Sequence, residues 1–306
     1  MKKKWVTLGS AIGISSIVMV TAGMSVMAGT SGYDTYKSAL KTTKAAKSVS
    51  VQAEAVVQDN GVVLTSANGS FKASLDNKTG SGTVDVTSGG AGQKLSFYKQ
   101  ESGTVLKSAD SDVYYVRQDE QDKQDKRKKA KEPIDQAIPQ QVETVIDALV
   151  GNLKDYVAVD AKADGSKEVS VELTNAQLPA VVNAIAPIAI KNAVKEHHDG
   201  GKEEAVDNKG ELPFNKDFLG QEPQLSQDIK IDKVSLKAVI DASNYITHQE
   251  ADLTVSGKDE AGTPHVVTFH VNADLSDYNS TTPDQIDLTG KQVQTIKNDH
   301  KWKREN

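Results

Sequence analysis

Few residues of this sequence have the types and spacing of a catalytic or metal site. The most suggestive group is His197-His198-Asp199, which is followed by Glu203-Glu204. Imidazole and carboxylate groups are zinc ligands, but adjacent histidines on a loop rarely converge on one ion, and no spaced His-x-x-x-His pair supports them. We therefore expect a solvated polar loop over 197–227, and we predict neither a metal site nor a cofactor.

The other candidates for catalysis fit ordinary structural positions. His248 and His270 fall on the polar faces of two predicted strands, whereas His265 falls on an inward position and is expected to be half-buried. No serine lies in a Gly-x-Ser-x-Gly turn, and the glycine-rich stretch 80–92 lacks the Lys-Ser/Thr ending of a phosphate loop. The sequence therefore predicts that the protein is not an enzyme.

The charge balance argues against a nucleic-acid partner. The 306 residues carry 36 Lys+Arg and 42 Asp+Glu. Without the three lysines of residues 1–28 the net charge is −9, whereas a nucleic acid requires a basic protein face. The chain has no cysteine, so we expect neither a disulfide framework nor an acylated cysteine anchor.

Residues 1–28 have the parts of an export signal. Three lysines at 2–4 precede an uncharged run that ends Val26-Met27-Ala28, and this order is typical of a signal peptide. Cleavage after Ala28 would release the protein, whereas a retained leader is long enough to anchor it in a membrane. We expect an extracytoplasmic protein, secreted or anchored at the outer face of the cytoplasmic membrane. The missing lipid anchor favours a Gram-positive bacterium.

Alternation of apolar residues predicts an antiparallel sheet in both halves of the chain. A short helix is expected over 33–46, and from Ser48 the pattern switches to the period of a half-buried strand. Asp59-Asn60-Gly61 predicts a hairpin turn, because Asn and Gly accept positive φ. The alternation resumes at Ile229, with a slip near Asp232-Lys233 that indicates a bulge.

Two later segments have helical spacing. A charged connector over 118–132 precedes an apolar stripe over 134–153, and residues 176–195 are apolar around much of the helix circumference. The expected fold class is α+β. A single domain over 29–290 would hold a curved antiparallel β-sheet, or half-barrel, with helices on its concave face, and a polar tail over 291–306 is expected to fray.

The many apolar side chains of these two predicted helices have two interpretations. The side chains either fill a core or roof a pocket for a lipid-like ligand, since such pockets are concave and mostly apolar. The pocket interpretation assigns ligand binding to Ile146, Leu149, Val150, Leu153, Leu178, Val181, Val182, Ile185 and Ile188.

The order of elements resembles the bacterial lipoprotein-carrier superfamily that includes LolA and the LppX/LprG-type proteins. The resemblance covers 33–288 and rests on Tyr36-Lys37-Ser38-Ala39-Leu40, Val49-Ser50-Val51, Tyr114-Tyr115-Val116, Asp277-Tyr278-Asn279 and Ile286-Asp287-Leu288. It implies an antiparallel half-barrel closed by helices around an apolar cavity. Two features depart from the family: the lipidation cysteine is missing, and the first sheet is poor in large side chains.

We therefore expect an exported, non-catalytic protein of the cell envelope that binds a hydrophobic ligand or a partner protein. A retained leader would add membrane association. The alternative is a structural or sensory envelope protein with a filled core and no small ligand. An apolar cavity would support the first interpretation, and side chains that fill the concave face would support the second.

Overall fold

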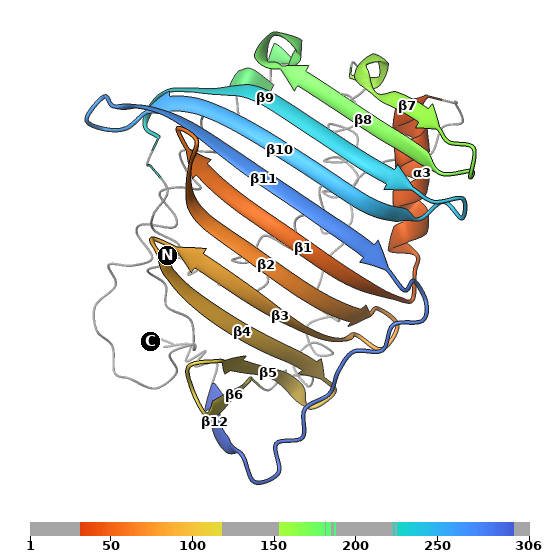
Figure 1. The fold of residues 1–306 in the computed structure, drawn as a ribbon, viewed down its shortest axis with the longest axis vertical. Coiled ribbons are helices and arrows are strands. Elements are labelled where there is room, and N and C mark those ends of the chain that lie inside the picture. Colours follow the sequence, from red (N-terminus) through yellow and green to blue (C-terminus); the bar gives the residue numbers. More distant parts are fainter. Residues whose placement is uncertain are drawn as a thin grey trace, which may run out of the picture.

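The computed structural model describes residues 31–117, 153–180, 182–184, 187, 223 and 225–296, and these residues form one large open sheet (Figure 1). Its twelve strands lie in the order β12-β6-β5-β4-β3-β2-β1-β11-β10-β9-β8-β7. The strands are β1 Ser48–Asp59, β2 Val62–Ser74, β3 Thr79–Ser88, β4 Ala91–Gln100, β5 Gly103–Ser108, β6 Val113–Arg117, β7 Ala158–Ala161, β8 Lys167–Thr174, β9 Gln227–Ile240, β10 Ile246–Lys258, β11 Pro264–Ser276 and β12 Gln292–Ile296.

The first hairpin confirms the turn predicted from the sequence. β1 and β2 are joined by Asn60 and Gly61, whose φ angles are 49° and 82°. Positive φ at both central residues gives a turn whose twist matches that of the flanking strands. The bulge predicted near Asp232 is also present, because the partner on β9 changes from Lys233 to Ile231 between Thr254 and Val255 of β10.

Two runs of strands that are separate in sequence join into one sheet. β1 to β6 form one antiparallel meander, and β7 to β11 form a second. They meet where β1 pairs with β11, with Ala53 opposite Ala273. The only parallel pair among the described strands is β12 with β6, so the predicted antiparallel sheet is confirmed with one exception at an edge.

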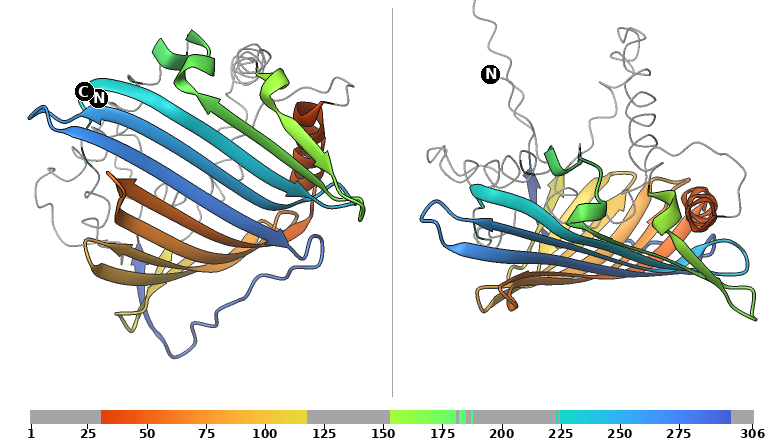
Figure 2. Two further views of the ribbon diagram at one scale, coloured as in Figure 1. Left: turned by 45° about the horizontal axis from the view of Figure 1, so that its top comes forward. Right: turned by 90° about the horizontal axis from the view of Figure 1, so that it is seen from above.

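Figure 2 shows that the sheet curves toward the side that carries helix α3 (Gly32–Lys44). Ser31 caps this helix, because its Oγ accepts a hydrogen bond from the Asp34 amide at 3.2 Å. The helix buries Ala39 and Leu40 against the concave face. Gly32 allows its first turn to lie close to the chain before β7, since a side chain there would collide with the Val157 carbonyl.

The helices differ from the expected α+β arrangement. The described residues are mostly β, and α3 is the one helix longer than a turn or two among them. The segment 134–152 and the connector 118–132 lie outside the described residues. Within the predicted helix 176–195, the described part begins with a 3₁₀ turn at Asn175–Gln177, and Ala180, residues 182–184 and residue 187 are helical.

The C-terminal segment runs along one end of β1–β5 before it forms β12 (Figure 1). Asn279 Oδ1 accepts a hydrogen bond from the Lys47 amide at 2.8 Å, and Asp284 pairs with Lys72 at 2.9 Å. Further along, the Ile286 amide donates to Gln100 Oε1 at 2.6 Å. Gln292–Ile296, which was expected to fray, is therefore held in place as a strand.

No helix in the part of the chain that the structure describes is long and apolar enough to cross a membrane. The leader over 1–28 lies outside that part, so its fate stays a prediction.

Candidate functional site

The concave face of the sheet carries three buried apolar clusters, of which the smallest, Val84, Val86 and Leu95, lies on β3 and β4. The first lies against α3 and consists of Tyr36, Ala39, Leu40, Val51, Ala53, Val169, Ala238, Ile240, Ile246, Ala273 and Leu275. The second lies toward the opposite ends of the same strands and consists of Leu173, Leu178, Leu225, Ile231, Val255 and Val267. The alternation of the strands places both clusters on one face, because residues two apart point the same way.

An apolar band separates these clusters on the central strands. We call it the inner strip and define it as Ala55, Val57, Ala251, Leu253, Phe269 and Val271. The register places these side chains in two cross-strand rows, with Val271 between Ala55 and Ala251, and Phe269 between Val57 and Leu253. The inner strip is half-buried except for Phe269, which is 37% exposed.

The exposure of Phe269 distinguishes the inner strip from a filled core. Its neighbours two residues away on the same face, Val267 and Val271, are buried and half-buried. A phenylalanine ring buries a large apolar area when it is fully covered, so an uncovered one in the middle of a concave apolar surface leaves room for an apolar contact.

The structure describes three of the nine residues predicted to line a pocket. Leu178 belongs to the second cluster, and Leu153 and Val182 pack against it. These three residues therefore lie together in one apolar cluster on the concave side. Six others lie outside the described residues: Ile146, Leu149, Val150, Val181, Ile185 and Ile188. A role for all nine in ligand binding stays a prediction.

A tyrosine is buried at the α3 end of the concave face. Tyr36 belongs to the first cluster and is 7% exposed. Burial raises its pKa to about 12, because the phenolate would lose its hydration. Its hydroxyl therefore stays protonated at any physiological pH, and this end of the concave face carries no charge from Tyr36.

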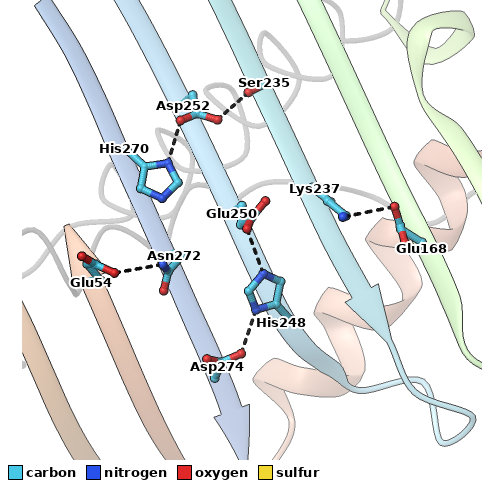
Figure 3. A network of polar contacts seen from close by, with 10 residues as sticks. All are labelled: Glu54, Glu168, Ser235, Lys237, His248, Glu250, Asp252, His270, Asn272 and Asp274. Carbon is cyan, nitrogen blue, oxygen red and sulfur yellow. Dashed lines mark hydrogen bonds and ion pairs between the residues drawn. The ribbon is translucent and has the colours of Figure 1, made fainter. Parts of the chain in front are cut away.

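The convex face carries a polar network on five strands (Figure 3). Two five-residue segments with the pattern His-x-Glu/Asn-Ala-Asp lie side by side, 248–252 on β10 and 270–274 on β11. Because the strands are antiparallel, each histidine lies opposite the aspartate of the other segment. His248 Nδ1 lies 2.7 Å from Asp274 Oδ1, and His270 Nδ1 lies 2.7 Å from Asp252 Oδ1.

Further contacts extend this network to the neighbouring strands. Ser235 Oγ on β9 donates to Asp252 Oδ2 at 2.8 Å, and Asn272 Nδ2 donates to Glu54 Oε2 on β1 at 3.3 Å. Burial opposes the charge of Asp252, but the hydrogen bonds from His270 and Ser235 outweigh it and lower the pKa of this carboxyl group. Asp252 is therefore a carboxylate at neutral pH.

A third histidine joins two hairpins at the end of the sheet. His265 Nδ1 lies 2.8 Å from Asp59 Oδ2, at the end of β1, and its Nε2 lies 3.6 Å from Asp259 Oδ2, in the β10–β11 turn. The hydrogen bond with Asp59 raises the pKa of His265, although burial works in the other direction. His265 is 15% exposed, so its inward position agrees with the sequence prediction.

These polar groups do not assemble a metal site within the described residues, where no three histidine or acidic side chains are placed to hold an ion. The segment His197-His198-Asp199 lies outside the described residues. The reciprocal His–Asp pairs were not foreseen from the sequence. The repeated five-residue pattern, together with the turn-forming residues Lys258-Asp259-Glu260-Ala261-Gly262 between its two copies, could have revealed them, because a hairpin fixes which residues lie opposite each other.

Comparison with known proteins shows no family for this chain. No family model matches it, and no curated protein matches it. Among solved structures, a DUF1329 family protein from Desulfovibrio piger aligns over 84% of this chain and 94% of its own, with 10% identity and a TM-score of 0.21. This weak structural match carries no conclusion about function.

Proposed function

We propose that this chain is an exported, non-catalytic protein of the cell envelope that holds a lipid-like apolar molecule against the concave face of its sheet. The single observation that supports the proposal most strongly is the inner strip, with Phe269 37% exposed between two buried clusters. An apolar ligand that covered this ring would remove apolar area from water, and that is the main favourable term in such binding.

The shape of the sheet favours an elongated ligand. The inner strip crosses β1, β11 and β10 at the same level, so its rows run perpendicular to the strands. Val234 and Val171 continue this apolar surface onto β9 and β8. Five strands at about 4.8 Å spacing give a surface roughly 20 Å across, which is comparable to an extended acyl chain.

The element order supports the same proposal through its resemblance to the LolA and LppX/LprG-type carriers. The leader 1–28 supports export, and the absence of cysteine argues for a free protein or for one held by the leader itself. We propose a Gram-positive envelope as its location. Such an envelope has no outer membrane to receive cargo, so binding or sensing fits better than shuttling.

The alternative is an envelope protein with a filled core that acts through protein contacts. The two buried clusters support it, because they already occupy both ends of the concave face. It differs from the first proposal in one respect only: the inner strip would be covered by the protein's own chain or a partner.

Native mass spectrometry of the protein purified from its own host separates these proposals. The ligand proposal expects a discrete added mass that organic solvent extracts as lipid, together with rebinding of a fluorescent fatty acid after delipidation. A protein of unmodified mass that also fails to bind the fluorescent fatty acid would overturn the ligand proposal.

A further inference from the structure

The three central strands turn one polar side chain toward the concave side away from their ends. Along the described strands β1, β10 and β11, the inward side chains between the strand ends are apolar except for Gln249 of β10. Gln249 is 8% exposed, so most of its amide is removed from solvent. A buried amide without hydrogen bonds is unfavourable, and folded proteins therefore rarely leave one without a partner.

Gln249 lies in a row of small side chains at the border of the inner strip. The register places Ala273 of β11 and Ala238 of β9 on either side of it, and Ala53 of β1 lies beyond Ala273. An alanine side chain ends at Cβ, so these neighbours cannot cover the Gln249 amide. The next inward residue of β10 is Ala251, which belongs to the inner strip. The amide therefore lies beside the inner strip, about 7 Å along the strand.

Helix α3 brings a second polar group to the same place. Tyr36 belongs to the cluster against α3, and its hydroxyl is buried with no hydrogen-bond partner of ordinary geometry among the described residues. Burial raises the pKa of Tyr36, and the nearby amide of Gln249 lowers it by a smaller amount. A hydroxyl and an amide together offer more donors and acceptors than one contact between them can use. We call Tyr36 and Gln249 the polar pair.

The described surroundings of the polar pair are uncharged. The cluster around Tyr36 consists of apolar residues, and the row around Gln249 consists of alanines and Val169 of β8. The burial that raises the pKa of Tyr36 would oppose any other anion in the same place, because an anion would lose its hydration there. An uncharged oxygen, such as that of a hydroxyl or an ester, loses much less and can accept the unused hydrogen bonds.

We propose that the polar pair binds the uncharged polar head of a ligand whose chain lies on the inner strip, so that the site selects fatty alcohols and acyl esters over ionised fatty acids. This inference rests on the proposed function, because it requires an apolar chain on the inner strip. Tyr36 Oη and the Gln249 amide would each donate a hydrogen bond to the head, and these buried groups would be satisfied in the complex. An ionised fatty acid would bind through its chain alone, with its carboxylate directed to solvent.

Competition between ligands of equal chain length that differ in the head tests this inference. Dodecan-1-ol, methyl dodecanoate and dodecanoate would each displace a fluorescent fatty acid from the delipidated full chain at pH 8, where dodecanoate is ionised. We expect the alcohol and the ester to bind about tenfold more tightly than dodecanoate. Tyr36→Phe and Gln249→Leu should each weaken binding of the alcohol about tenfold and leave that of dodecanoate within about twofold of the native value.

Tyr33→Phe provides the matched control, because it removes the hydroxyl of another buried tyrosine of α3 that lies outside the cluster of Tyr36. It should bind all three ligands within about twofold of the native protein, and circular dichroism would establish that each variant is folded.

Two results would overturn the inference and leave the proposed function intact, because the chain would still bind. One is equal affinity of the native protein for the alcohol and for dodecanoate, and the other is an equal loss of alcohol binding in Tyr36→Phe and Tyr33→Phe. Failure of every ligand to bind, the fluorescent fatty acid included, would overturn both the inference and the proposed function.

Discussion

The two faces of strand β10 have opposite chemistry over residues 250–255, whereas Gln249, on the inward face, is polar and buried. Leu253 and Val255 point into the concave side and contribute to apolar packing, whereas His248, Glu250 and Asp252 point outward into a polar network. The same division holds on β1 and β11, because β11 pairs with both β1 and β10 in continuous antiparallel register. One face therefore stabilises the fold by excluding water, and the other meets water and charged partners.

The difference between the two faces predicts which substitutions should change the stability of the fold and which should change only binding. The concave clusters are buried, so a change there removes contacts that no solvent replaces. The convex pairs are exposed and screened, so they contribute little to stability. The predictions below test this division, beginning with the largest expected effect.

A truncation in the concave core should produce the largest loss of stability. Ile240 is fully buried in the cluster against α3, and Ile240→Ala should lower the free energy of unfolding by about 2–5 kcal/mol, as measured by urea denaturation. Val239, its outward-facing neighbour, provides the control. Val239→Ala should cost at most about 1 kcal/mol, and equal losses in both variants would contradict the division.

Overpacking of the concave face should come next. Gly82 on β3 lies between the rings of Phe71 and Phe97, whose centroids are 5.9 Å apart, and an added Cβ would lie 2.7 Å from the Ser70 carbonyl oxygen. Gly82→Ala should therefore lower the free energy of unfolding by about 1–3 kcal/mol. Gly92 on the outward face has ordinary contacts, so Gly92→Ala should change it by at most about 0.5 kcal/mol.

The histidine that joins the two hairpins should make stability depend on pH. Because the pKa of His265 is raised in the folded protein, its stabilising contribution is fully present below the unfolded value of about 6.5 and is lost as the pH rises through the folded value. His265→Gln should therefore lower the melting temperature more at pH 5.5 than at pH 9.

The matched control for this pH effect is a variant without a titrating group. Ile240→Ala should lower the free energy of unfolding by a similar amount at both pH values. If His265→Gln lost equal stability at pH 5.5 and pH 9, the contacts with Asp59 and Asp259 would not depend on the charge of the imidazole.

The smallest effect should come from an exposed ion pair on the convex face. Lys94 and Asp85 are 53% and 54% exposed, so Lys94→Met should change the free energy of unfolding by at most about 0.5 kcal/mol. A loss of more than about 1 kcal/mol in urea denaturation would show that the outward face contributes to stability after all.

Local patterns predicted much of this fold. The strand from Ser48, the turn at Asn60-Gly61 and the bulge near Asp232 depend on the chemistry of adjacent residues, and all three are present. The alternation of Val267, Phe269, Val271, Ala273 and Leu275 in the sequence is also consistent with their shared inward face. The alternation could not show that Phe269 is exposed, since exposure depends on what packs over the sheet.

Local sequence patterns could not predict which distant strands pair with each other. The join between β1 and β11 links segments more than two hundred residues apart, and no local residue marks it. The same holds for β12, whose five residues pair in parallel with β6 only because the segment after β11 is held along the ends of β1–β5. The ligand-binding pocket predicted from the two helices stays a prediction for all nine residues, and six of them lie outside the described residues: Ile146, Leu149, Val150, Val181, Ile185 and Ile188.

The proposed binding of an apolar ligand can be tested most directly at Phe269. A delipidated preparation of the full chain would be titrated with a fluorescent fatty acid, alongside Phe269→Asp on the concave face and Thr268→Asp on the outward face of the same strand. We expect Phe269→Asp to weaken binding at least about tenfold, because a carboxylate would be placed against the acyl chain. Thr268→Asp should bind like the native protein. Equal binding by the native protein and both variants, with all three folded by circular dichroism, would contradict the account.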